Sequence, residues 1–146
     1  MPFNHISLPT GPASSALMRE FYKVLLRPIG YTIYYENEAM IGFKNPVTSA
    51  DFWLHQGGED IAKLDTSSEA AALKHVKTLS RAHVAFNVGS PSEVDQWYEN
   101  AIKAGGVSNG PPGLRSFAKD YYAAFVLDPL GNNIEAVHYK LPSSSS

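Results

Sequence analysis

Hydrophobic and polar residues alternate at the start of the chain, and the pattern then changes to helical spacing. Residues 3–8 alternate as a strand does and place His5 on one of its two faces. Residues 9–12, with two prolines and a glycine, predict a break after this strand. A helix is predicted to begin at about Ser14, a suitable N-cap, and to be ended by Pro28 and Gly30. Three strand-like runs follow, at 31–36, 39–44 and 50–56.

The second half of the chain repeats this order. Residues 82–88 predict a strand that carries His83 near its start, and residues 89–92 break it and cap a helix. The helix keeps apolar residues at helical spacing until Gly105 and Gly106 end it. Two amphipathic helices that end in glycine look alike by chance, but a histidine-bearing strand before each helix favours a repeated βαβββ unit. The strands that complete the second unit are predicted near Val107, at 121–128 and at 133–139.

The repeat divides the chain into two units joined by a polar segment. The units span about 1–57 and 81–140, and the connector 58–80 is predicted to be a surface linker with one or two helical turns within 67–76. Residues 1–142 are thus expected to form one domain of two modules. The serine-rich tail, 143–146, is expected to be disordered.

Composition limits the classes of function. The 146 residues carry a formal net charge of −2 with no basic stripe, which disfavours nucleic acid as a partner. No apolar run approaches the roughly 20 residues of a membrane-spanning helix, so no membrane partner is expected. The absence of cysteine excludes disulfides, a thiol nucleophile and cysteine-ligated zinc, and together with the lack of a signal-like N-terminus it favours a cytoplasmic location.

The densest pattern lies in the second half. The segments 81–86 (RAHVAF), 110–115 (GPPGLR) and 121–137 (YYAAFVLDPLGNNIEAV) resemble the vicinal oxygen chelate superfamily, and the DPLGNNIE stretch is the most specific part. This superfamily includes glyoxalase I, the extradiol dioxygenases, and the fosfomycin and bleomycin resistance proteins. The resemblance implies an α+β fold in which two βαβββ modules form a curved, cup-like mixed sheet.

The resemblance also implies a metal site inside the cup. His5 and His83 match the ligand positions on the first strand of each module, and Glu135 matches the position on the last strand of the second module. Glyoxalase I usually offers a fourth, carboxylate ligand near the position that Trp53 occupies here. Two histidines and one glutamate are closer to the extradiol dioxygenase pattern and leave coordination positions open for substrate.

Each of these residues also has a simpler interpretation. A histidine in a strand is often a half-buried side chain with its hydrogen bonds satisfied, and Glu135 in an apolar run could be exposed on an edge strand. We favour metal binding because the three occur together with the motif. The ligand types suit Zn, Ni, Mn, Co or Fe(II) and do not choose among them.

Further candidates surround the expected cup. Tyr121, Tyr122 and Lys119 are candidates for proton transfer, and Arg115 for holding an anionic group. Consecutive tyrosines in a strand face opposite sides, so one of the two is expected to pack away from the site. Trp53 and His55 share a strand face and are candidates for substrate binding, although we favour the rim of the cup for His55. His75 and His138 are expected to be solvated or to pack outside the site.

The resulting hypothesis is a metal-dependent, glyoxalase-like lyase or isomerase that acts on a small oxygenated molecule. Two alternatives stay open: an Fe(II) extradiol-type dioxygenase, and a non-catalytic small-molecule or drug-binding protein of the resistance type. The resemblance further implies a homodimer, in which modules are sometimes exchanged between chains.

Overall fold

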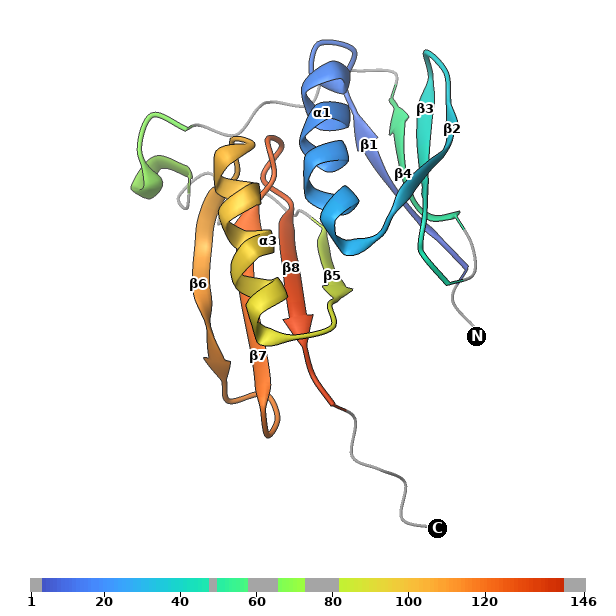
Figure 1. The fold of residues 1–146 in the computed structure, drawn as a ribbon. Helices are drawn as coiled ribbons and strands as arrows, with labels where there is room; N and C mark the ends of the chain where they lie inside the picture. The colour runs from blue at the N-terminus through green and yellow to red at the C-terminus, as the bar shows by residue number, and fades with distance from the viewer. Residues whose placement is uncertain (1–3, 48–49, 58–65, 73–81, 141–146) are drawn as a thin grey trace.

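The computed structural model describes residues 4–47, 50–57, 66–72 and 82–140, and it consists of two similar modules (Figure 1). The first module comprises β1 (Ile6–Thr10), α1 (Ser15–Leu26), the short 3₁₀ helix η1 (Arg27–Ile29), β2 (Thr32–Glu36), β3 (Met40–Lys44) and β4 (Ala50–Gln56). The second comprises β5 (His83–Asn87), α3 (Pro91–Lys103), β6 (Val107–Arg115), β7 (Tyr121–Leu127) and β8 (Asn133–His138). Among the helices of the described residues, none combines the length and the apolarity that crossing a membrane requires.

Each module folds its strands into one mixed sheet. The strand orders are β1-β4-β3-β2 and β5-β8-β7-β6, so the two sheets have the same topology. The first and last strands of each module pair in parallel, and the other neighbours are antiparallel. The prediction of an α+β fold with two βαβββ modules is confirmed.

Two of the boundaries that differ from the prediction involve proline. β1 starts at Ile6 and continues through Pro9 to Thr10, so the break predicted at 9–12 is wrong for its first two residues. β6 is longer than expected and includes Pro111 and Pro112. Both are edge strands, where a residue without an N–H group interrupts no hydrogen bond on the outer side of the sheet.

The helical sides of the two sheets share one core. α1 and α3 lie side by side (Figure 1) and pack against each other, and the buried apolar residues of both modules form one cluster. The rings of Phe52 and Phe86, from β4 and β5, lie 5.4 Å apart between centroids. The buried Tyr22 hydroxyl donates a 2.6 Å hydrogen bond to Asp128, which joins α1 to the turn between β7 and β8. The opposite face of each sheet therefore points away from this core.

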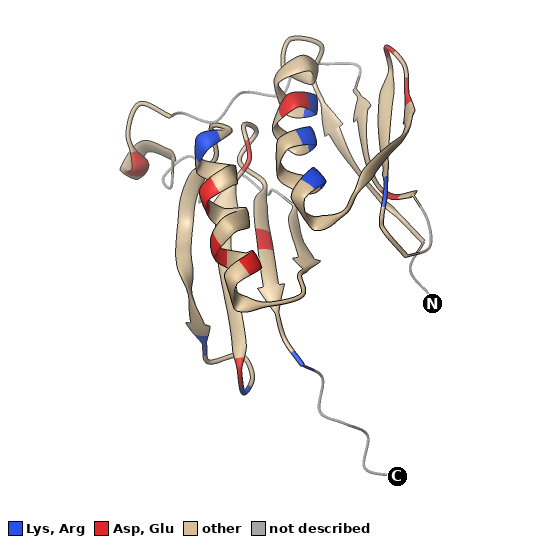
Figure 2. Cartoon of the chain, viewed as in Figure 1, with Lys and Arg blue, Asp and Glu red and all other residues tan. Residues whose placement is uncertain are grey.

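The connector and the surface are described only in part. Residues 69–72 are helical, within the segment predicted to contain helical turns, and Ala72 is buried next to Leu127. Residues 58–65 and 73–80 of the connector, which include His75, and the tail 143–146 lie outside the described residues. Figure 2 shows charged positions of both signs on each of the two helices.

Candidate metal centre and adjoining pocket

Two of the three predicted ligands meet on the second sheet. His83 begins β5, and Glu135 lies on the neighbouring parallel strand β8, two positions beyond Asn133, the register partner of His83. The flanking residues of Glu135, Ile134 and Ala136, are buried in the core beneath α3, so alternation turns Glu135 to the opposite face. His83 Nε2 lies 3.0 Å from Glu135 Oε2.

The Glu135 carboxylate is buried and held by a tyrosine. Its side chain is 3% exposed, and its Oε1 accepts a 2.6 Å hydrogen bond from the Tyr121 hydroxyl. Burial, together with the hydrogen bond and the charge of Glu135, raises the pKa of Tyr121 to about 12. The phenol therefore keeps its proton at neutral pH and acts as a donor to the carboxylate.

The His83 ring is oriented by a backbone carbonyl. Nδ1 lies 3.1 Å from the carbonyl oxygen of Asn133, which can only accept, so the contact places a proton on Nδ1. Metal-binding histidines commonly donate one ring N–H to a carbonyl in this way and bind the metal with the other nitrogen. Nε2 lies close enough to a carboxylate oxygen for a proton or a metal ion to bridge the two atoms. The pair thus fits two corners of a metal site.

His5 does not join this pair. It precedes β1, is exposed, and its Nδ1 lies 2.7 Å from the side-chain oxygen of Asn4. Within residues 4–47, 50–57, 66–72 and 82–140, no three His, Cys, Asp or Glu side chains come close enough to hold a metal ion together. The described part of the chain therefore assembles His83 with Glu135 and leaves the third predicted ligand on the other module.

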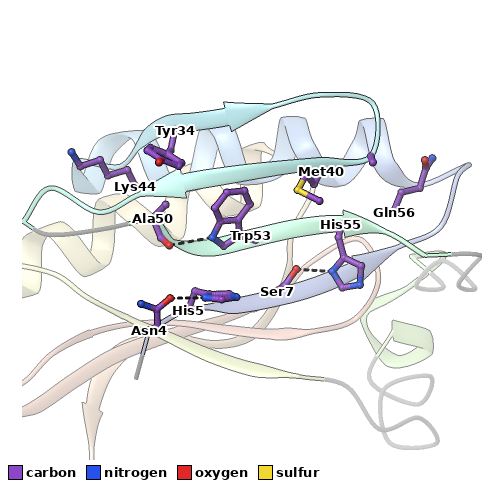
Figure 3. A pocket seen from close by; sticks show the side chains of 11 residues that line it. Asn4, His5, Ser7, Tyr34, Met40, Lys44, Ala50, Trp53, His55 and Gln56 are labelled. Carbon is purple, nitrogen blue, oxygen red and sulfur yellow. Dashed lines mark hydrogen bonds between the residues drawn. The ribbon is translucent and has the colours of Figure 1, made fainter. Parts of the chain in front are cut away.

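His5 instead lines an open pocket of about 900 Å³ on the first sheet, on the face opposite α1 (Figure 3). The residues that line it all come from the first module. Trp53 and His55 project into it from β4, as their shared parity predicted, while Phe52 and Leu54 between and beside them are buried in the core. His55 Nδ1 lies 2.6 Å from the Ser7 hydroxyl oxygen on β1.

No family model matches the chain, and neither does any curated protein sequence. Solved structures do match it. A glyoxalase/bleomycin resistance protein from Albidiferax ferrireducens superposes with a TM-score of 0.69 at 24% identity, over 96% of this chain and all of that one. A glyoxalase-related enzyme from Fulvimarina pelagi gives 0.65 at 16% identity, over 100% and 96% of the two chains. The fosfomycin resistance protein FosX of Listeria monocytogenes gives 0.63 at 15% identity, over 97% and 95%.

The chain has the vicinal oxygen chelate fold. The resemblance seen in the sequence implied that the inner faces of the two modules would line one common cup. Here the described strands form two separate sheets, and the faces that carry His5 and Glu135 lie on different modules. Within the described residues, each module thus presents one such face, with His5 on the first and Glu135 on the second. We call each of these two faces a half-cup.

The remaining candidates fall on several surfaces of this fold. Tyr122 faces α3, where its hydroxyl donates a 2.8 Å hydrogen bond to Asp95, so it does not lie beside Glu135. The Arg115 guanidinium donates to the backbone carbonyls of Pro111 and Leu114 and lies over the Phe125 ring. Lys119 is exposed in the turn between β6 and β7, and His138 contacts the Val88 carbonyl.

Two features of the site had little or no signal in the sequence. The Asn133 carbonyl orients His83 through the parallel register of β5 and β8, which no local pattern reveals. The contact between Ser7 and His55 depends on the parallel register of β1 with β4, which no local pattern reveals either.

Proposed function

We propose that the protein is a metal-dependent enzyme of the glyoxalase-like lyase or isomerase type that acts on a small oxygenated molecule. The observation that carries the proposal is the convergence of His83 Nε2 and Glu135 Oε2 on the inner face of the second sheet. Both side chains are pre-oriented, the imidazole by the Asn133 carbonyl and the carboxylate by Tyr121. A buried carboxylate that is held in this way is costly without a function to offset its desolvation.

The third ligand in this proposal is His5 of a second copy of the chain. The pocket that holds His5 is open and is lined by one module, so it has room for the inner face of another module. Every residue of the edge strand β2 is exposed, including Ile33, Tyr34 and Tyr35, and a soluble monomer seldom leaves so much apolar surface uncovered. A symmetric homodimer would cover it and would build two identical composite sites.

The chain's own residues have distinct roles in such a site. His83, Glu135 and His5 hold the ion, which can be Zn, Ni, Mn, Co or Fe(II), and the bound metal would supply Lewis-acid stabilisation to a substrate with adjacent oxygens. Tyr121 keeps its proton and fixes one oxygen of Glu135, which leaves the other oxygen for the ion. Ser7 and His55 offer a hydrogen-bonded pair for proton transfer on the opposite half of the cup.

Metal content tests the proposal without knowledge of the substrate. Purified protein analysed for transition metals should contain one of these ions, and His83→Ala or Glu135→Ala should lower its content by at least about tenfold. His138→Ala is the matched control, because His138 lies on β8 but contacts the Val88 carbonyl instead of Glu135. A metal content that neither ligand variant changes would show that this pair is not a metal site.

A second candidate function is an Fe(II) extradiol-type dioxygenase. It is supported by the donor set itself, because two histidines and one carboxylate are the ligands typical of non-haem Fe(II) oxygenases. Protein loaded with ferrous iron should then consume oxygen in the presence of catechol. A protein that binds metal but consumes no oxygen under these conditions fits the lyase or isomerase proposal instead.

A further inference from the structure

The indole of Trp53 lies flat against its own sheet because the neighbouring strand has a glycine beneath it. Gly42 on β3 is the register partner of Trp53, and a methyl group at position 42 would overlap three carbons of the six-membered ring. Any larger residue there would push the ring off the sheet. The ring therefore rests on backbone and turns its other side toward the open pocket (Figure 3).

Three contacts hold the ring in this position. Its Nε1 donates a 3.1 Å hydrogen bond to the carbonyl of Ala50. Tyr34 meets it at an interplanar angle of 81° with 6.1 Å between centroids, and Tyr35 packs at 6.4 Å. A ligand that stacks on this indole would have little side-chain entropy to remove, which favours binding. Trp53 is thus a preorganised aromatic platform.

A polar pair lies beside the platform. Ser7 is the register partner of Trp53 on the other neighbouring strand, and its hydroxyl contacts His55 Nδ1 at 2.6 Å. The pair can both donate to and accept from an oxygen atom on a ligand. Lys44 also lines the pocket and disfavours a cationic ligand. The pocket volume of about 900 Å³ is within the range of small-molecule sites.

We propose that this pocket binds a flat aromatic or heteroaromatic group, stacked on Trp53, whose hydroxyl or carbonyl oxygen reaches the Ser7–His55 pair. The inference rests on the proposed function in that it names the class of substrate for the same cup. The residues that would contact the aromatic ligand nevertheless all belong to the first module and include neither His83 nor Glu135. It can therefore be tested in the absence of metal.

The probe is 7-hydroxycoumarin, a flat bicyclic phenol, titrated by calorimetry into chelator-treated protein. We expect saturable binding that is weakened about tenfold by Trp53→Leu and also by Gly42→Ala, which displaces the ring. Octahydrocoumarin, the saturated and non-planar counterpart, should bind at least about fivefold more weakly than coumarin. Tyr98→Phe, on α3 and outside the pocket, should leave the affinity unchanged.

The polar half of the site has its own variant. In the unaltered protein 7-hydroxycoumarin should bind more tightly than coumarin, and Ser7→Ala should abolish this difference. Circular dichroism establishes whether each variant is folded. If Gly42→Ala does not fold, Trp53→Leu alone tests the stacking. Emission from the protein's two tryptophans reports the same event, because Trp97 is buried in the core and only Trp53 lines the pocket.

The outcomes separate this inference from the proposed function. Any one of three results would overturn the aromatic site. These are absence of saturable 7-hydroxycoumarin binding, equal affinity for coumarin and octahydrocoumarin, and unchanged affinity in Trp53→Leu. If metal binding is intact in the same experiments, the proposed metal centre is still supported. Loss of the metal proposal together with Trp53-dependent binding of 7-hydroxycoumarin would instead identify a binding protein with an aromatic ligand.

Discussion

At the scale of single residues, the contact between Tyr121 and Glu135 is the most informative. The neighbouring tyrosines of β7 separate in space: Tyr121 donates to the Glu135 carboxylate, and Tyr122 donates to Asp95 on α3. Alternation along the sequence predicted that one of them would face each side. It did not reveal which, because that depends on the register of β7 with β8.

Removal of the Tyr121 hydroxyl should weaken metal binding without removing a ligand. In Tyr121→Phe, Glu135 Oε1 loses its donor and the carboxylate is less well oriented, so we expect metal affinity to fall by about tenfold or more. A competition titration with a chromophoric chelator measures this. Tyr122→Phe is the matched control and should bind metal normally; equal affinities in the two variants would remove Tyr121 from the site.

The buried tyrosine of the core predicts how stability depends on pH. Burial, and then the adjacent Asp128, raise the pKa of Tyr22 well above its ordinary value of 10.0. The folded protein therefore retains this proton after the unfolded chain has lost it. The contribution to the free energy of unfolding is complete below about pH 10 and is lost as the pH rises toward the folded pKa.

Equilibrium unfolding in urea between pH 8 and pH 11 measures this dependence. The free energy of unfolding of the unaltered protein should decline above about pH 10. Tyr22→Phe should be less stable than the unaltered protein at pH 8 by about 1–3 kcal/mol. Its free energy of unfolding should fall less steeply as the pH rises, because it lacks this proton. Tyr34→Phe, at an exposed position, should behave as the unaltered protein does. An identical alkaline decline in Tyr22→Phe would assign the effect to other groups.

At the scale of the elements, the helices were predictable, whereas the two edge strands that contain proline were not. Both helices carry local signals: apolar residues at helical spacing, a serine before the first turn, and glycine after the last. The edge strands β1 and β6 contain prolines that locally indicate a turn. Only the pairing with β4 and β7 makes these segments strands, and pairing is a long-range property.

The α3 cap is a local signal with a measurable contribution. The Ser90 hydroxyl accepts a hydrogen bond from the Glu93 amide, and Glu93 in turn accepts one from the Gly89 amide. Ser90→Ala should lower the free energy of unfolding by about 1 kcal/mol in guanidinium titration. Gln96→Ala, at an exposed position within the same helix, should change it by no more than about 0.5 kcal/mol. Equal losses in the two variants would show that Ser90 does not act as a cap.

At the scale of the whole molecule, the two modules share a core on their helical sides and leave two half-cups. The sequence resemblance predicted both the modules and the ligand positions. It also implied that His5, His83 and Glu135 would share one site, whereas the structure brings His83 and Glu135 together and leaves His5 in a separate pocket. The placement of one module relative to the other depends on contacts such as those of Phe52 with Phe86 and Tyr22 with Asp128, which no local motif encodes.

The central claim is that each metal site takes His5 from one chain and His83 with Glu135 from another. The most direct measurement is the metal content of a heterodimer between a His5→Ala chain and a Glu135→Ala chain, carrying different affinity tags and purified by both. Each variant alone should be nearly free of metal. The heterodimer should recover about half of the unaltered protein's metal, because one of its sites combines the intact His5 of one chain with the intact His83 and Glu135 of the other. A heterodimer as empty as the two parent variants would contradict the composite site.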